Sequence, residues 1–123
     1  MALKNRSPLS SIVQYQNHAP KLHDSVFLAC GARVVGEVSM EADSSVWFSA
    51  VVRGDVHFIK IGQKTNIQDG ALIHCTYKKN PTTIGNRVSV AHLAIVHGCT
   101  IEDDCLIGMG AIVMDRAVVG AGS

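Results

Sequence analysis

The chain has 123 residues and a mass of 13.1 kDa, the size of a single domain. Its 11 Lys and Arg residues nearly balance 10 Asp and Glu residues, and no block of like charge forms a basic face, which argues against nucleic acid as the main partner. With 47% hydrophobic and 17% charged residues, the composition is too apolar for a disordered chain, yet no apolar run is long enough to span a membrane. Aromatic residues make up only 5%, whereas small and β-branched residues are abundant, so we expect a soluble protein built mainly of strands.

The cysteines and the N-terminus indicate a cytoplasmic protein with reduced thiols. Four cysteines, Cys30, Cys75, Cys99 and Cys105, form no CxxC pair. Nothing at the N-terminus resembles a signal peptide. Residues 1–23 contain three basic residues and no acidic one, but they lack the Arg-rich amphipathic pattern of a transit peptide.

Aliphatic residues recur six positions apart along most of the chain. This period does not fit an α-helix of 3.6 residues per turn, whereas short strands joined at corners would point one aliphatic residue inward from each strand. The pattern is the hexapeptide repeat of a parallel β-helix. The aliphatic positions are Leu28, Val34, Met40, Val46, Val52, Ile61, Ile67, Ile73, Ile84, Val90, Val96, Ile101, Ile107, Val113 and Val119. Four places later stands a residue that is usually small, as at Ala32, Thr65, Ala94, Thr100 and Cys105.

Three aliphatic positions per turn give about five coils, which would stack about 4.8 Å apart into a triangular prism. An antiparallel sandwich fits poorly because hairpin-type turn dipeptides are scarce. The period is interrupted at three places. The segment 52–61 has three extra residues and the segment 73–84 has five, and both additions predict loops on the solvent side. The second loop is expected at 77–81. The segment 96–101 is one residue short.

The repeat places two histidines together. His74 and His97 each follow an inward aliphatic residue by one, so they share an outward column one coil apart, and Arg53 lies in that column a coil earlier. Two imidazoles about 4.8 Å apart can share a zinc ion, because Zn–N bonds are about 2.0 Å long. His92 falls on the neighbouring face or its corner, with Asp69 one coil before it.

We expect the third ligand to come from another copy of the chain. Five residues of extended backbone, at about 3.3 Å each, separate His92 from His97 and carry it out of side-chain reach. A cyclic trimer would bring the His92 of a neighbour to each site and close the contact. Stacked exposed histidines can also be incidental, but this register favours a metal because polar side chains surround it. Those side chains are Arg53, Asp55, Gln68 and Asp69.

The other histidines and cysteines have less specific expectations. His18 and His23 precede the repeat and are expected at the surface, whereas His57, in the first interruption, is either a surface residue or part of the site. Cys75 adjoins a candidate ligand, but its side chain should point inward as a packed thiol, and Cys105 occupies an inward position in the core.

Two segments, SVWFSAVVRGDVHFIKIGQKTNIQDGALIH and VAHLAIVHGCTIEDDCLIGMGAIV, resemble the γ-class carbonic anhydrase family. The most specific motifs are RGD at 53–55, NIQD at 66–69 and H-x4-HG at 92–98. The resemblance implies an all-β fold, a single-stranded left-handed parallel β-helix. Residues 1–11 would form an N-terminal extension, and 12–123 a β-helix domain truncated at its C-terminus, without the C-terminal helix of the family.

The resemblance also implies a metal, an assembly and a reaction. The family binds zinc, or iron or cobalt, through three histidines at a homotrimer interface, which match His74, His97 and, from the neighbouring copy, His92. The implied reaction is the reversible hydration of carbon dioxide to bicarbonate, in which the metal lowers the pKa of its bound water toward 7 and the resulting hydroxide attacks carbon.

Five further residues acquire roles from the resemblance. Arg53 and Asp55 would form an ion pair between subunits, and Gln68 would orient the solvent on the metal. Asn66 and Asp69 would support the ligands, since each imidazole needs its second nitrogen held by an acceptor.

The chain departs from the family prototype at the places that would move the proton. Val56 stands where the prototype has a glutamate, and loop 76–83 contains Lys78 and Lys79 but no acid. Buffer or His57 would have to substitute. Ala91 also replaces a glycine that usually precedes the second histidine.

Carbonic anhydrase activity is therefore the expectation rather than the sole hypothesis. A metal-dependent thioesterase or esterase, and a non-catalytic trimeric scaffold with a structural metal, are alternatives that fold alone does not separate. Hexapeptide acyltransferases generally use a catalytic histidine without metal, and three histidines in ligand register argue against that class.

Overall fold

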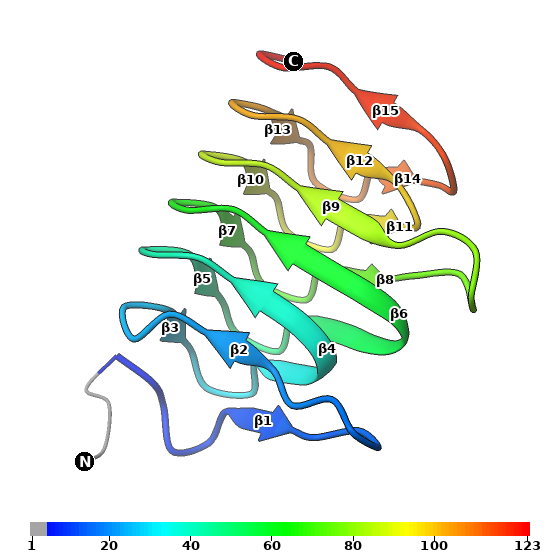
Figure 1. Cartoon of the computed structure of the whole chain (residues 1–123). Coiled ribbons are helices and arrows are strands. Elements are labelled where there is room, and N and C mark those ends of the chain that lie inside the picture. Colours follow the sequence, from blue (N-terminus) through cyan, green and yellow to red (C-terminus); the bar gives the residue numbers. More distant parts are fainter. Residues whose placement is uncertain (1–4) are drawn as a thin grey trace.

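The computed structural model describes residues 5–123, and every element within them is a strand. The strands pair in parallel and wind into a solenoid of about five turns, with the N-terminus at one end and the C-terminus at the other (Figure 1). As the chain climbs in Figure 1, the near strands run to the left and the chain returns behind them, which is the left-handed sense. The predicted all-β, left-handed parallel β-helix is confirmed.

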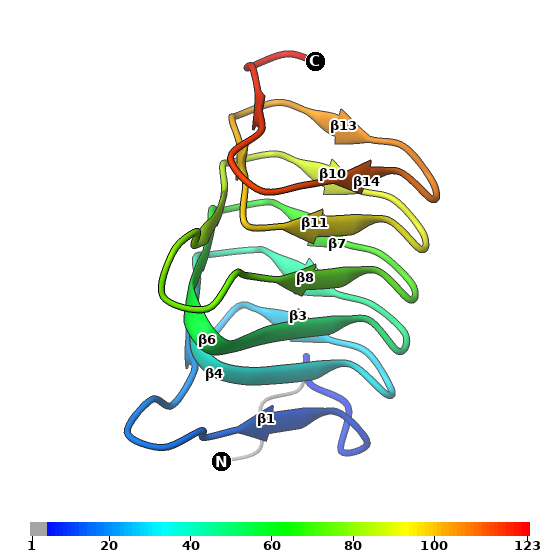
Figure 2. The same cartoon turned by 90° about the vertical axis from the view of Figure 1, so that its right-hand side faces the viewer.

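One face of the prism is a five-stranded sheet, and the other two faces are halves of a ten-stranded sheet (Figure 2). The five-stranded sheet contains β3 (Phe27–Leu28), β5 (Ser45–Val46), β7 (Asn66–Ile67), β10 (Ser89–Val90) and β13 (Leu106–Ile107). One half of the large sheet contains β1 (Ser11–Val13), the first parts of β4 (Arg33–Met40) and β6 (Val51–Ile61), then β8 (Leu72–His74), β11 (Ile95–His97) and β14 (Ile112–Val113). The other half contains β2 (Lys21–Leu22), the second parts of β4 and β6, then β9 (Thr82–Ile84), β12 (Thr100–Ile101) and β15 (Val118–Val119).

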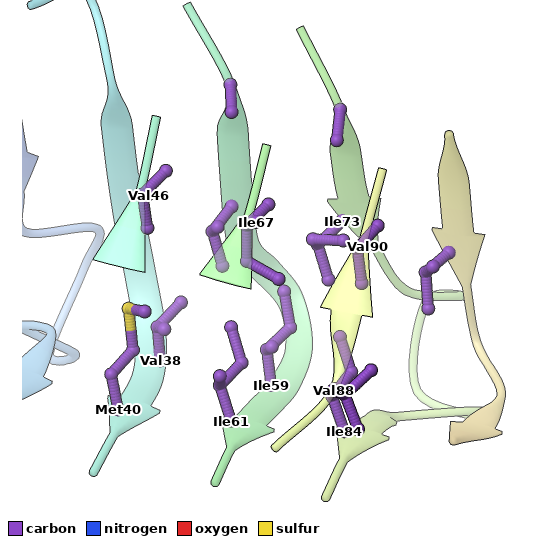
Figure 3. Packing of buried hydrophobic residues seen from close by; sticks show 14 of the residues in the cluster. Val38, Met40, Val46, Ile59, Ile61, Ile67, Ile73, Ile84, Val88 and Val90 are labelled. Atoms are coloured by element: carbon purple, nitrogen blue, oxygen red, sulfur yellow. The ribbon is translucent and has the colours of Figure 1, made fainter. Parts of the chain in front are cut away.

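The predicted aliphatic positions stack in the core, with Val38, Ile59 and Val88 packed beside them (Figure 3). From Leu28 to Ile107 these side chains are at most 5% exposed, whereas Val113 and Val119 in the last coil are partly buried. Burying one such side chain stabilises the fold by about 1.5–3 kcal/mol. The small positions, such as Ala32 and Ala94, are fully buried too and let the corners close tightly.

One small position was predicted wrongly. Thr100 is exposed, and Cys99 takes the inward place with 2% exposure. The missing residue near Gly98 shifts the count, so the inward residue lies two places before the next aliphatic residue, Ile101. Gly98 turns the chain there with a φ of 61°.

The first interruption is also a correction. Its three extra residues form no solvent loop but lie within the continuous strand β6, opposite β4. Between the pairs Gly36–Gly54 and Val38–Ile59, a single residue of β4 faces residues 55–58 of β6, so the extra length is an irregular β-bulge. A parallel ladder on both sides of the bulge keeps the segment extended.

The second interruption is the predicted loop. Residues 75–81 leave the stack beside β8 and are closed by an antiparallel bridge between Thr76 and Asn80 (Figure 2). All three changes in length fall at the corner between the two halves of the ten-stranded sheet.

The solenoid takes in residues ahead of the predicted repeat. β1 and β2 pair with β4, and Arg6 forms a bridge with Leu28. His18 and His23 lie in this segment and are exposed, as predicted. Among residues 5–123, no helix is long and apolar enough to span a membrane.

Candidate metal centre

His74 and His97 lie side by side on neighbouring strands. They end β8 and β11, which pair in register at these two residues, and their ring centroids are 5.3 Å apart. The side chains are 16% and 26% exposed, so both rings are accessible from solvent without being loose. The predicted histidine column is confirmed.

A carboxylate from the bulge of β6 holds the first imidazole. Asp55 Oδ1 lies 3.0 Å from Nε2 of His74, and Asp55 Oδ2 accepts a hydrogen bond of 2.6 Å from Arg53. Burial opposes the ionisation of Asp55, but the hydrogen bonds from Arg53 and His74 outweigh it and lower its pKa. The resemblance implied an ion pair between subunits, whereas Arg53 and Asp55 bond here within one chain.

A second carboxylate, which sequence reasoning missed, holds the other imidazole. Asp115 Oδ1 lies 2.7 Å from Nδ1 of His97, and Oδ2 accepts hydrogen bonds from Asn80, at 3.2 Å, and from the Thr76 hydroxyl. The bond from Thr76, followed by that from His97, lowers the pKa of Asp115 to about 2. Asp115 therefore ties His97 to loop 75–81.

Asp115 had a weak signal in the sequence. It stands one coil after Gly98 rather than after His97, because the coils here are offset by 17 residues instead of 18. A Cβ on Gly98 would come within 2.9 Å of Asp115 Oδ1, so the missing side chain leaves room for the carboxylate to reach back to the imidazole.

These carboxylates select the tautomer that each ring adopts in its neutral form. Since an ionised carboxylate only accepts hydrogen bonds, the ring nitrogen that faces it must carry the proton. The neutral imidazoles then keep a lone pair on Nδ1 of His74 and on Nε2 of His97. Imidazoles oriented by carboxylates are the usual donors of zinc sites.

A second group, the amide cluster, lies on the five-stranded sheet and its corner. Gln68 Nε2 donates to Asn66 Oδ1 at 2.9 Å, and Asn66 Nδ2 donates to Ser89 Oγ at 3.0 Å. His92 Nδ1 lies 3.6 Å from Asp69 Oδ1, which confirms the predicted stacking of these two residues. With Ser45 and Trp47, four of these side chains line a surface cavity of about 440 Å³.

The two groups do not meet within one chain. No hydrogen bond or ion pair in the described part of the chain joins the histidine pair to the amide cluster, and no three metal-ligating side chains among residues 5–123 come close enough to hold an ion. The donor chemistry thus fits two ligands of a metal site, with His92 held apart on another face.

The remaining candidates divide between core and cavity. Cys75 and Cys105 are buried thiols, as predicted. Burial raises the pKa of Cys99 to about 11, so this thiol stays protonated. His57 lines a cavity of about 650 Å³ together with Asp55, and its Nδ1 accepts a hydrogen bond from the backbone N–H of the next residue at 2.9 Å.

Sequence and structure comparisons place the chain among known proteins. No family model matches it. Gamma carbonic anhydrase 2, mitochondrial, from Arabidopsis thaliana is 45% identical over 106 residues, which cover 82% of this chain and 38% of the relative. A carbonic anhydrase from Geobacillus kaustophilus is 38% identical over 111 residues, covering 90% of this chain and 60% of the relative. The chain thus spans between about two fifths and three fifths of the length of these relatives.

A solved structure agrees with the fold and the family. The hexapeptide transferase family protein from Anaplasma phagocytophilum superposes with a TM-score of 0.83 at 39% sequence identity, covering 90% of this chain and 68% of that chain. Its family name matches the six-residue repeat. The chain belongs to the γ-class carbonic anhydrase-like family of hexapeptide-repeat, left-handed β-helix proteins.

Proposed function

We propose that the chain is a metal-dependent γ-type carbonic anhydrase that interconverts carbon dioxide and bicarbonate at sites shared between copies of a homotrimer. The observation that carries the proposal is the register pairing of His74 with His97, each fixed by its own carboxylate. The names of the relatives support the chemistry.

The proposed ligands are His74 and His97 of one copy and His92 of the adjacent copy. Two imidazoles are too few for a catalytic zinc site, which normally has three protein ligands, and His92 is half exposed at a corner where a second copy can approach it. Zinc is the proposed ion, with iron(II) and cobalt(II) as alternatives. Such an ion supplies a Lewis acid that makes water nucleophilic near neutral pH.

The amide cluster is proposed to orient the reacting water. Asn66 accepts the amide hydrogen of Gln68 and so fixes the plane of that side chain. The carbonyl oxygen Oε1 of Gln68 is then left to accept a hydrogen bond from water. A donor or acceptor fixed before the reaction costs no reorganisation during it, which is how such groups lower a barrier.

Hydration of carbon dioxide by water yields bicarbonate and one proton, which must leave the site. Val56 cannot carry it. His57 borders the same cavity as Asp55, but its Nδ1 lone pair already accepts the following N–H, so in this orientation the ring has no free nitrogen to take the proton. We therefore assign proton removal to dissolved buffer.

The proposed compartment is the cytoplasm. All four cysteines are free, as expected in a reducing environment. The Arabidopsis relative is named mitochondrial.

The test is carbon dioxide hydration by anaerobically prepared protein, loaded with zinc or iron(II) and of confirmed trimeric mass. Turnover should be present in this chain and lost in His92→Ala. A trimer that holds metal without turnover would overturn the activity and favour a thioesterase, an esterase or a structural role for the metal. Acyl transfer that survives complete chelation would favour the acyltransferase class.

A further inference from the structure

A buried hydroxyl lies behind the two histidines, at a position that is apolar in other coils. Thr82, in β9, stands two places before an inward aliphatic residue and is 0% exposed. Its counterparts at this corner are Val38, Ile59 and Cys99. Burying a hydroxyl is costly unless it is hydrogen-bonded, so its partners identify its role.

Apart from a longer contact of 3.7 Å from the Cys75 thiol, the partners of the hydroxyl are backbone groups at the ends of the histidine strands. Thr82 Oγ1 donates to the carbonyl oxygen of His74 at 2.5 Å and accepts from the backbone N–H of Gly98, the residue after His97, at 2.8 Å. The same N–H also approaches the His74 carbonyl, at 3.2 Å. One side chain therefore bridges the ends of β8 and β11.

The Thr82 bridge lies at the end of the paired region of β8 and β11. The ladder between β8 and β11 ends at His74 and His97. One coil takes 11 residues from Ile73 to its next inward aliphatic residue, Ile84, while the other takes five from Val96 to Ile101. After the long hydrogen bond of 3.2 Å from the Gly98 N–H to the His74 carbonyl, the two backbones diverge, so the Thr82 hydroxyl adds the shorter link between them.

We infer that Thr82 is a positioning residue for the metal site, which sets the relative height of His74 and His97 through their backbones. This inference rests on the proposed function, because it assigns the purpose of the bridge to metal binding. Oriented ligands raise metal affinity, and losing a group that orients them typically costs 10–100-fold.

The chain contains a matched control for the bridge. Thr65 is also 0% exposed, and its hydroxyl donates to the Gly85 carbonyl at 2.6 Å and accepts from the Val88 N–H at 3.1 Å. It joins two coils in the same manner, at a corner that holds none of the candidate ligands. Removing either hydroxyl should destabilise the fold similarly, but only Thr82 should affect the metal.

The experiment measures zinc affinity by competition with a chromophoric chelator, together with hydrogen exchange of the Gly98 amide in the metal-free chain. We expect Thr82→Val to weaken zinc binding about 10–100-fold and to speed exchange at Gly98, whereas Thr82→Ser should stay within about threefold of the unmodified chain. Thr65→Val should lower the unfolding temperature without changing zinc affinity. If Thr82→Val does not fold, Thr82→Ala should show the same loss.

Zinc affinity in Thr82→Val equal to that of the unmodified chain would overturn the inference, as would an equal loss in Thr65→Val. An unmodified chain that binds no zinc would overturn the proposed function, and the inference with it. Zinc binding by the unmodified chain distinguishes the two failures: if that chain binds zinc, only the inference about Thr82 is at stake.

Discussion

His97 lies over His74 one coil later, with ring centroids 5.3 Å apart, and the two rings are fixed by carboxylates from different coils. Asp55 reaches the pair from the coil before, and Asp115 from the coil after. Four successive turns of the solenoid thus build one face of the proposed site. The neighbouring copy would supply the opposite face of the site, with His92.

A shared site predicts that two defective variants restore each other. The His92→Ala chain lacks the ligand that completes the metal site of the adjacent copy. The His97→Ala chain lacks a ligand of its own metal site. After random mixing into trimers, about one quarter of the sites should combine an intact His97 with an intact His92 from the adjacent copy. Zinc per chain, measured by mass spectrometry after co-refolding, should reach about a quarter of the unmodified value. A mixture that binds no more than either variant alone would rule out a site between copies.

Loss of Asp115 should release both His97 and loop 75–81. We expect Asp115→Ala to weaken zinc binding about 10–100-fold. In the metal-free chain it should also speed hydrogen exchange at Thr76 and Asn80, whose amides close the loop. Asp115→Asn keeps one acceptor oxygen for His97 and should lose less.

The control for Asp115 is Asp104→Ala. Asp104 pairs with Arg87 at the exposed surface and touches no candidate ligand, so neither zinc affinity nor loop exchange should change. Equal behaviour of the two alanine variants would contradict the role given to Asp115.

If buffer removes the proton, the maximal rate of carbon dioxide hydration should rise with buffer concentration until another step limits it. His57→Gln should match the unmodified chain at every concentration, because the Nδ1 lone pair of His57 is already engaged. Stopped-flow assays with imidazole buffers of increasing concentration measure this directly. A rate independent of buffer, or a large loss in His57→Gln, would show that the chain carries the proton itself.

The bulge opposite β4 depends on a close approach of two glycines. Gly36 has a φ of 76°, and a Cβ there would lie 2.3 Å from the carbonyl oxygen of Gly54. Gly36→Ala should therefore lower the free energy of unfolding by about 2–3 kcal/mol, through backbone strain and forced movement of the strand. Gly108→Ala is the control, since nothing lies within 4 Å of its added Cβ. Chemical denaturation measures both, and equal midpoints would refute the argument.

The six-residue period was enough to predict the architecture. It identified the stacked core from Leu28 to Ile107 and the histidine pair, because a solenoid converts spacing in the chain directly into position on a face. The left-handed winding was different. It came from the family resemblance, since a period has no handedness.

The failures occurred where the period changes. Counting forward from Val96 gave Thr100 instead of Cys99. Asp115 was missed because the coils after His97 are offset by 17 residues, so it aligns with Gly98 and stands one place past the histidine column. The extra residues of β6 were expected outside because a count of residues cannot distinguish a loop from a bulge held in a ladder. Thr82 was missed for a related reason, as its role depends on two backbone groups rather than on a side-chain motif.

Every departure from six in the repeat falls at one corner, while the steps at the other two corners are all six residues. The chain length at those two corners is constant, whereas the third corner accepts insertions and deletions. A peptide inserted between Tyr77 and Asn80 would replace the surroundings of His74 without moving an inward side chain. Divergence within such a fold, or design upon it, can therefore alter what reaches the site while the packed rows stay unchanged.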